Sequence, residues 1–190
     1  MKNIILFGKP GAGKGTQAAL LRDNFQLVHI STGDLFRYNI SNNTSLGALA
    51  KSYMDKGDLV PDQVTIKMLE AEVDANPDVG GFIFDGFPRT AAQAEALDVF
   101  LEGKNMSIRA TIALEVEEEV LVNRLLSRGK DSGRSDDQDE DKIRNRFAEY
   151  NKKTAPLIGY YKAQNKFYSI LGEGTVAEIS EKLNSLLYLL

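Results

Sequence analysis

Apolar positions along the chain follow two different periods. Short runs rich in β-branched and aromatic residues, such as residues 4–7 and 81–84, predict buried strands. Longer stretches with apolar residues every three or four positions predict amphipathic helices. The predicted strands are 3–7, 27–30, 81–85, 109–115 and 166–171, and the predicted helices are 13–24, 32–42, 46–56, 62–75, 90–102, 117–128, 139–163 and 175–189. Because strands and helices alternate, we expect an α/β fold with a five-stranded parallel sheet flanked by helices.

Composition narrows the class of protein. The 190 residues are 43% apolar, which is enough for one domain with a single core. The net charge of −4 argues against a protein that binds nucleic acid, because such proteins neutralise the phosphate backbone with basic residues. The chain has no cysteine, so disulfides and Cys-ligated zinc are excluded. No segment has the length of a signal peptide or membrane span, so we expect a cytoplasmic protein without a membrane partner.

A glycine-rich segment directly follows the first predicted strand. Residues 8–16 read GKPGAGKGT and lead into the first predicted helix. Glycines allow backbone N–H groups to surround a phosphate, the helix adds its positive end, and Lys14 adds a charge. We therefore predict a nucleotide-binding P-loop within a three-layer P-loop fold. A GTPase-type loop would have Ser or Thr directly after the lysine, whereas Gly15 stands there and Thr16 follows.

A second polar motif, DGFPRT at residues 85–90, follows the most apolar predicted strand. Because ligands gather at the carboxyl ends of parallel strands, we expect Asp85 beside the P-loop, where its carboxylate can hold Mg²⁺ through water. Arg89 offers a planar fork that suits a second phosphate. The alternative for Asp85 is that it only caps the turn before the helix at 90–102.

These motifs resemble those of the adenylate kinases, in the nucleoside monophosphate kinase family. The resemblance lies in the GKGT end of the P-loop, in DGFPRT with Gln93, and in HISTGD at residues 29–34 with Arg37, and it extends through the whole chain. It implies a single P-loop kinase domain, 1–190. The implied parts are a core of residues 1–30, 61–128 and 139–190, an AMP-binding arm at 31–60 and a short lid at 129–138.

The resemblance also implies two nucleotide sites. The ATP site would contain Gly11, Ala12, Gly13, Lys14, Gly15, Thr16, Arg124 and Gly174. The AMP site would contain Thr32, Arg37, Asp58, Leu59, Val60, Gly86, Phe87, Pro88, Arg89, Gln93, Arg134 and Arg146. Within the AMP site, Thr32 and Gln93 would contact adenine, and Arg37 and Arg89 would bind the phosphate. Mg²⁺, bound with ATP, would be held by Asp85 through water.

The charge of two nucleotides requires further cations, since AMP carries about −2 and ATP about twice that. Arg124 and Arg128 lie four residues apart on one predicted helix, although a solvated helix face would show the same spacing. By resemblance, Arg124 would stack on the ATP adenine, Arg128 would reach its phosphates, and Arg134 and Arg146 would close on the transferred group. The predicted catalytic residues are Lys14, Arg89, Arg124, Arg128, Arg134 and Arg146.

The segment 129–137, GKDSGRSDD, is polar and contains two glycines, so we expect a mobile surface loop between two helices. Long-lid adenylate kinases carry a long insertion here, often with zinc held by cysteines. The resemblance therefore implies a short-lid form without zinc. The spacing after this segment leaves open whether Arg144 or Arg146 reaches the phosphates.

The function implied by the resemblance is reversible transfer of a phosphoryl group from ATP to AMP, giving two ADP, in adenine nucleotide homeostasis. No long apolar edge or heptad pattern calls for a dimer, so we expect a monomer. The first alternative is another monophosphate kinase, with a UMP or CMP acceptor or a GTP donor, although Thr32 and Gln93 favour adenine. The second is a GTPase-type module, which would need a guanine-reading Asn-Lys-x-Asp segment that this chain lacks. His29, the one histidine, lies in a predicted strand, so we expect a core residue rather than a base.

Overall fold

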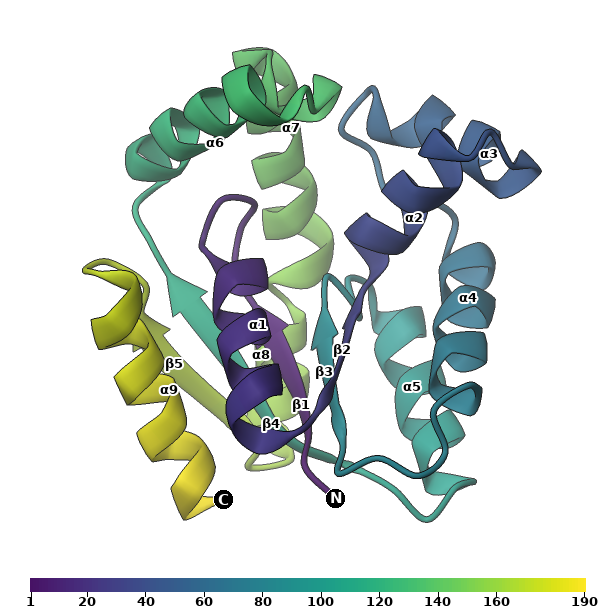
Figure 1. The fold of residues 1–190 in the computed structure, drawn as a ribbon, viewed down its shortest axis with the longest axis vertical. Coiled ribbons are helices and arrows are strands. Elements are labelled where there is room, and N and C mark those ends of the chain that lie inside the picture. Colours follow the sequence, from purple (N-terminus) through teal and green to yellow (C-terminus); the bar gives the residue numbers. More distant parts are fainter.

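The computed structural model describes residues 1–190 and contains one five-stranded sheet (Figure 1). The strands are β1 (Asn3–Phe7), β2 (Val28–Ser31), β3 (Phe82–Asp85), β4 (Ile108–Glu115) and β5 (Phe167–Leu171). All neighbours are parallel, in the order β2-β3-β1-β4-β5. Ile5 of β1 pairs with Phe84 of β3 on one side and with Thr111 of β4 on the other. The predicted α/β fold with five parallel strands is confirmed.

Nine α-helices accompany the sheet, and seven of them cover its two faces, which gives three layers. The nine helices are α1 (Lys14–Phe25), α2 (Thr32–Ser41), α3 (Ser45–Met54), α4 (Asp62–Asp74), α5 (Ala91–Glu102), α6 (Glu118–Ser132), α7 (Glu140–Glu149), α8 (Leu157–Ala163) and α9 (Val176–Leu189). Figure 1 shows α1 in front of the sheet, α8 behind it, and α4 beside α5. None of these helices combines the length and the apolarity that crossing a membrane requires.

Alternate residues of each strand enter two different cores. Ile4 and Leu6 of β1 pack into the core that α1, α6, α7 and α9 cover. Ile5 and Phe7 pack into the core that α4, α5 and α8 cover. This alternation is the period of two expected for a strand, and burial of both faces explains why β1 reads as a continuous apolar run.

The segment 31–60, called the arm below, has a small core of its own. Phe36, Ala50 and Val60 are the buried apolar residues of this core. Its two helices begin at capped positions, because the Ser31 hydroxyl accepts from the N–H of Asp34 and Thr44 caps α3 in the same way. The arm is therefore packed as a unit beside the sheet, as Figure 1 shows for α2 and α3.

The prediction of a mobile loop over residues 129–137 is wrong for its first part. Helix α6 continues to Ser132 and ends at Gly133, which has the left-handed φ of 65° that favours glycine. Inside the helix, a side chain at Gly129 would place its Cβ 2.6 Å from the carbonyl oxygen of Asp137. The polar composition of this segment therefore reflects a helix end that packs closely on the next turn, a 3-10 turn at Ser135–Asp137.

The single helix predicted over 139–163 is broken into three parts. Helix α7 ends at Glu149, a π turn spans Tyr150–Thr154, and α8 begins after Pro156. Proline has no N–H to donate and its ring crowds the preceding turn. The chain accommodates it with a wider turn, in which the N–H of Ala155 donates to the carbonyl of Tyr150 at 2.8 Å.

Candidate active site

A cavity of about 840 Å³ lies at the carboxyl ends of β1 and β3. The ends of these strands contribute Phe7 and Asp85 to its wall. The arm lines one side, and residues of α6, α7 and the turn between them line the other. In Figure 1 these two groups of helices stand on either side of the upper end of the sheet. This is where ligands bind in open parallel sheets, and the volume suits ligands of nucleotide size.

The P-loop joins β1 to α1 and encloses its own lysine. Gly8 has a φ of 143°, and a Cβ at this position would lie 2.9 Å from the carbonyl oxygen of Leu114. The Lys14 Nζ donates to the carbonyl oxygens of Gly8 at 2.8 Å and Lys9 at 3.2 Å. Burial lowers the pKa of Lys14 to about 8, although the nearby charge of Asp85 opposes this shift. An anion bound in the loop would favour the charged lysine.

Asp85 lies beside the P-loop, as the motif order predicts. Its Oδ2 is 3.7 Å from the place where a Cβ on Gly15 would stand. The same oxygen lies 3.4 Å from Nε2 of His29. Burial by itself would raise the pKa of Asp85, but the hydrogen bond with His29 and the charges of Lys14 and Arg89 bring it below its ordinary value. Asp85 is thus held as a carboxylate.

His29 differs from the prediction of a core residue. Its side chain keeps 14% of its surface exposed, lines the cavity and faces Asp85. The sequence placed it correctly in β2, but alternation along a strand does not by itself show which positions near the carboxyl end border a cavity.

The carboxylate of Asp85 suits magnesium in one particular mode. The structure contains no group of three or more His, Cys, Asp or Glu side chains arranged for a metal ion. Mg²⁺ commonly keeps several waters and binds through one or two carboxylates together with substrate phosphates. A single carboxylate next to a phosphate-binding loop fits this mode, in which the nucleotide supplies the other oxygen ligands.

Arg89 is fixed by three backbone and side-chain contacts. Its Nε donates to the carbonyl of Gly86 at 2.7 Å, and its backbone N–H donates to Oε1 of Gln93 at 2.7 Å. Its own carbonyl accepts from the hydroxyl of Thr154 at 2.9 Å. Burial lowers the pKa of Arg89 to about 10, and the charge of Arg146 acts in the same direction. The Arg89 guanidinium thus lies where too little negative charge balances it, and a bound anion would supply that charge.

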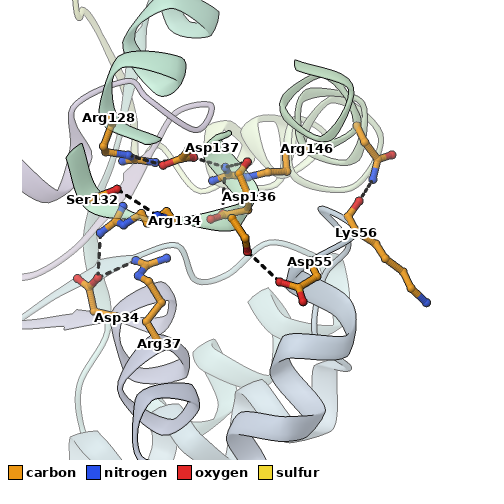
Figure 2. A network of polar contacts seen from close by, with 12 residues as sticks. Asp34, Arg37, Asp55, Lys56, Arg128, Ser132, Arg134, Asp136, Asp137 and Arg146 are labelled. Carbon is orange, nitrogen blue, oxygen red and sulfur yellow. Dashed lines mark hydrogen bonds and ion pairs between the residues drawn. The ribbon is translucent and has the colours of Figure 1, made fainter. Parts of the chain in front are cut away.

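The arm brings Arg37 to the same cavity. The Nη2 of Arg37 lies 2.6 Å from Oδ1 of Asp34, and Nη2 of Arg134 lies 3.7 Å from the same oxygen. Figure 2 shows Asp34 between these two arginines, which come from the arm and from the turn after α6. Thr32 is buried and donates its hydroxyl hydrogen to the carbonyl of Gly86 at 2.9 Å.

A fully buried carboxylate, Asp137, joins two further arginines (Figure 2). Arg128 donates to it from Nε at 2.7 Å and from Nη2 at 3.0 Å, and Arg146 donates from Nη1 at 2.7 Å. Arg146 also lies 3.1 Å from Oδ2 of Asp136. Burial raises the pKa of Asp137, but its hydrogen bonds and the charges of both arginines lower it overall. These charged hydrogen bonds, bidentate for Arg128, fix the orientation of both guanidinium groups.

The remaining arginines are divided between cavity and surface. Arg124 lines the cavity, with Nη1 at 3.5 Å from the carbonyl oxygen of Gly172. Arg144 is exposed and pairs with Glu119 and Glu140 at 3.2 and 2.7 Å. Between the two arginines that the spacing left open, the cavity contains Arg146 and not Arg144.

Three hydrogen bonds join the arm directly to the opposite side of the cavity, and one of them runs from the Asn145 side-chain amide to Oδ1 of Asp58 at 3.3 Å. The hydroxyl of Ser135 donates to Oδ1 of Asp55 at 2.9 Å, a contact that Figure 2 shows. The side-chain amide of Asn145 in α7 donates to the carbonyl of Lys56 at 2.8 Å. The residues that make these bonds are polar, and the two donors come from the 3-10 turn after α6 and from α7.

Most of the predicted site residues border this cavity. They are Gly11, Gly13, Lys14, Gly15, Thr16, Thr32, Arg37, Asp58, Leu59, Val60, Asp85, Gly86, Phe87, Pro88, Arg89, Gln93, Arg124, Arg128, Arg134 and Arg146. Ala12 and Gly174 do not border it. Sequence reasoning missed the roles of Asp34, Asp136, Asp137 and Thr154. Acidic residues two and three positions after Arg134 were the available signal for a charge network, whereas nothing in the sequence indicated the contact of Thr154 with Arg89.

A P-loop that faces several arginines across one cavity, on a parallel sheet of this order, defines a P-loop nucleotide phosphotransferase. Comparison with known proteins agrees: a model of the family "Adenylate kinase" matches residues 6–166. Adenylate kinases of Flavobacterium psychrophilum and Flavobacterium johnsoniae are 64% and 61% identical, each over 98% of both chains. That of Bacteroides fragilis is 46% identical over 96% of both. The chain belongs to the adenylate kinase family, which confirms the family predicted from its motifs.

Proposed function

We propose that the protein is an adenylate kinase that transfers the γ-phosphoryl group of ATP reversibly to AMP, giving two ADP. The observation that carries this proposal is that one cavity is lined both by the P-loop and by several arginines from other elements, which would form two anion sites. Lys14 and the P-loop form one of them. Arg37 and Arg89 border the other. A protein that only binds or hydrolyses one nucleotide has no need of the second.

On the donor side, the P-loop N–H groups and Lys14 would hold the ATP phosphates, and Arg128 would reach them from α6. Asp85 would hold Mg²⁺ through its water shell. When bound, the magnesium ion neutralises phosphate charge and orients the phosphates. Arg124, which lines the cavity near Gly172, would stack on the adenine of ATP.

On the acceptor side, Arg37 and Arg89 would bind the phosphate of AMP. One of its oxygens attacks the γ-phosphorus, the bond from that phosphorus to the β,γ-bridging oxygen breaks, and ADP leaves with the electron pair. A phosphate monoester has its second pKa near 6, so the attacking oxygen is already ionised and no general base is required. The protein therefore contributes position and charge stabilisation.

The carboxylates of the site support this role by holding the arginines in place. Asp137 fixes Arg128 and Arg146, and Asp34 lies between Arg37 and Arg134. Arginines that are already oriented lose less entropy when they bind a phosphate. Phosphate oxygens carry more charge than one carboxylate, so a bound phosphate would compete with Asp137 and Asp34 for the arginine N–H groups. The arginines would then donate to the transferred group from directions that are already set.

The proposal includes closure of the arm and of a short lid at residues 129–138 over the nucleotides. Excluding water would prevent hydrolysis of ATP. It also includes a monomer that works in the cytoplasm without a zinc ion. Light scattering during gel filtration tests the monomer, and metal analysis of the purified protein tests for zinc.

A coupled assay of ADP formation tests the central claim. The wild-type protein should form ADP only when ATP and AMP are both present. Arg89→Ala should lower kcat/KM by about a hundredfold or more, because the variant loses charge stabilisation of the reacting phosphates. Arg144→Ala, which removes an exposed arginine outside the cavity, is the matched control and should keep ordinary activity. Ordinary activity in Arg89→Ala would contradict the assigned role. Assays with UMP or CMP as acceptor and with GTP as donor test whether the protein is another monophosphate kinase.

A further inference from the structure

Gln93 lies at the wall of the cavity with both ends of its amide bonded to protein. The residue is 2% exposed and lies in the first turn of α5. Oε1 accepts from the backbone N–H of Arg89 at 2.7 Å. Nε2 donates to Oδ1 of Asp62 at 2.8 Å. Asp62 is the first residue of α4, which Figure 1 shows beside α5.

These two partners determine which way the amide points. The oxygen and nitrogen of a glutamine amide have nearly the same shape, so a free amide can turn over. A backbone N–H can only donate, and a carboxylate can only accept. A reversed Gln93 would set two donors against each other at Arg89 and two acceptors against each other at Asp62. The amide therefore has one stable orientation.

Asp62 is itself held in place. Its second oxygen, Oδ2, accepts from the hydroxyl of Thr90 at 2.9 Å. Thr90 caps α5, because its hydroxyl oxygen also accepts from the backbone N–H of Gln93 at 3.3 Å. Asp62, Thr90, Gln93 and Arg89 thus form a closed set of contacts that connects the start of α4 to the start of α5.

The bonds to protein leave one lone pair on Oε1 and one hydrogen on Nε2 of Gln93 unused. Phe36, Met54 and Val60 line the same cavity and supply apolar surface suited to a flat ring. A base edge with an amino group next to a ring nitrogen acceptor matches this donor and acceptor order. A base edge with a carbonyl next to a ring N–H presents the opposite order.

We propose that Asp62 is a specificity-determining positioning residue: by fixing the Gln93 amide, it makes the acceptor site select an amino purine over an oxo purine. This inference rests on the proposed function, because it concerns the base of the phosphoryl acceptor. Asp62 acts through Gln93 and is not among the residues that line the cavity.

AMP and IMP provide the sharpest test, because they differ only at the edge that carries the amino or oxo group. A site built around fixed hydrogen bonds strongly rejects the analogue with the wrong pattern. In the wild type, AMP should therefore be preferred greatly over IMP. In Asp62→Ala, the ratio of kcat/KM for AMP to that for IMP should fall at least about tenfold, through a higher KM for AMP and a lower KM for IMP. The KM for ATP should stay within about twofold of the wild type.

Asp98→Asn is a matched control. The Asp98 carboxylate also accepts two side-chain hydrogen bonds, from Tyr160 at 2.7 Å and Gln164 at 3.2 Å, and lies outside the cavity. Its AMP to IMP ratio should equal that of the wild type. Should Asp62→Ala fail to fold, Asp62→Asn keeps the shape of the side chain but has only one acceptor oxygen for two donors, so it should still lower the ratio several-fold.

Equilibrium binding of AMP and IMP by calorimetry separates the possible failures. If the wild type binds AMP but does not convert it, the proposed function fails, and the change in binding preference in the variant still tests Asp62. An unchanged AMP to IMP ratio in the folded Asp62 variants would overturn the inference. An equal loss of affinity for AMP, IMP and ATP would also overturn it, because that pattern indicates a purely structural role.

Discussion

Among individual residues, Lys14 has a charge that depends strongly on what the site contains. Its ammonium group is bonded only to carbonyl oxygens of the loop, and burial lowers its pKa to about 8. A bound phosphate adds negative charge beside it and favours the protonated form. Binding of ATP and protonation of Lys14 should therefore be linked near the pH range in which the enzyme is assayed.

This linkage predicts a pH dependence of ATP binding. As pH rises through about 8, free Lys14 loses its proton, so binding must first restore it. From this group alone, the Kd for ATP should rise about tenfold between pH 7 and pH 9. Calorimetry at pH 8.5 in two buffers of different ionisation enthalpy should show uptake of most of one proton per ATP. AMP is the control, and no proton uptake with ATP would contradict the linkage.

At the scale of elements, the sequence predicted structure well where one local signal was sufficient. The five strands followed from apolar runs, and the P-loop from its glycines and Lys14, because each depends on neighbouring residues only. The predicted end of α6 was wrong because glycine is common in loops, whereas Gly129 lies inside the helix and allows it to pack closely against Asp137. The break before α8 depends on Pro156 and on a π turn that no period reveals.

The π turn has a testable role in the site. It places the buried hydroxyl of Thr154 against the carbonyl of Arg89, far away in sequence. Thr154→Val keeps the shape but leaves that carbonyl without its donor, at a cost of about 1 kcal/mol. The KM for AMP should therefore rise about fivefold, with the KM for ATP unchanged. Steady-state kinetics check this, Thr154→Ser should restore the wild-type value, and an equal rise in both KM values would argue against the role.

At the scale of the whole molecule, the two termini lie at the end of the sheet opposite to the cavity (Figure 1). Lys2 donates to the carbonyl of Leu187 at 2.6 Å, and Arg109 donates to that of Leu190 at 2.7 Å, so the carboxyl-terminal helix is fastened there. The arm and the segment from α6 to α7 lie at the carboxyl ends of the strands instead. The contacts between these two parts join residues about 80 positions or more apart in sequence, so sequence patterns did not predict them.

The hydrogen bonds from Ser135 to Asp55 and from Asn145 to Lys56 and Asp58 should hold the arm against the opposite wall of the cavity. Neither donor borders the cavity, so the double variant weakens closure while every side chain that lines the cavity is kept. Each exposed bond contributes about 0.5–1 kcal/mol, so the double variant Ser135→Ala, Asn145→Ala should raise the KM for both AMP and ATP by several-fold. Its kcat should not fall, because opening releases product.

Small-angle X-ray scattering provides the second measurement on this double variant. Its radius of gyration without nucleotide should exceed that of the wild type, and the two should agree once both nucleotide sites are filled. Ser127→Ala removes a hydroxyl from α6 that is also exposed and makes no bond to the arm, so it should change neither KM nor size. A rise in the KM for only one nucleotide would mean that arm and lid close independently. The direct contact between them would then not couple the two sites.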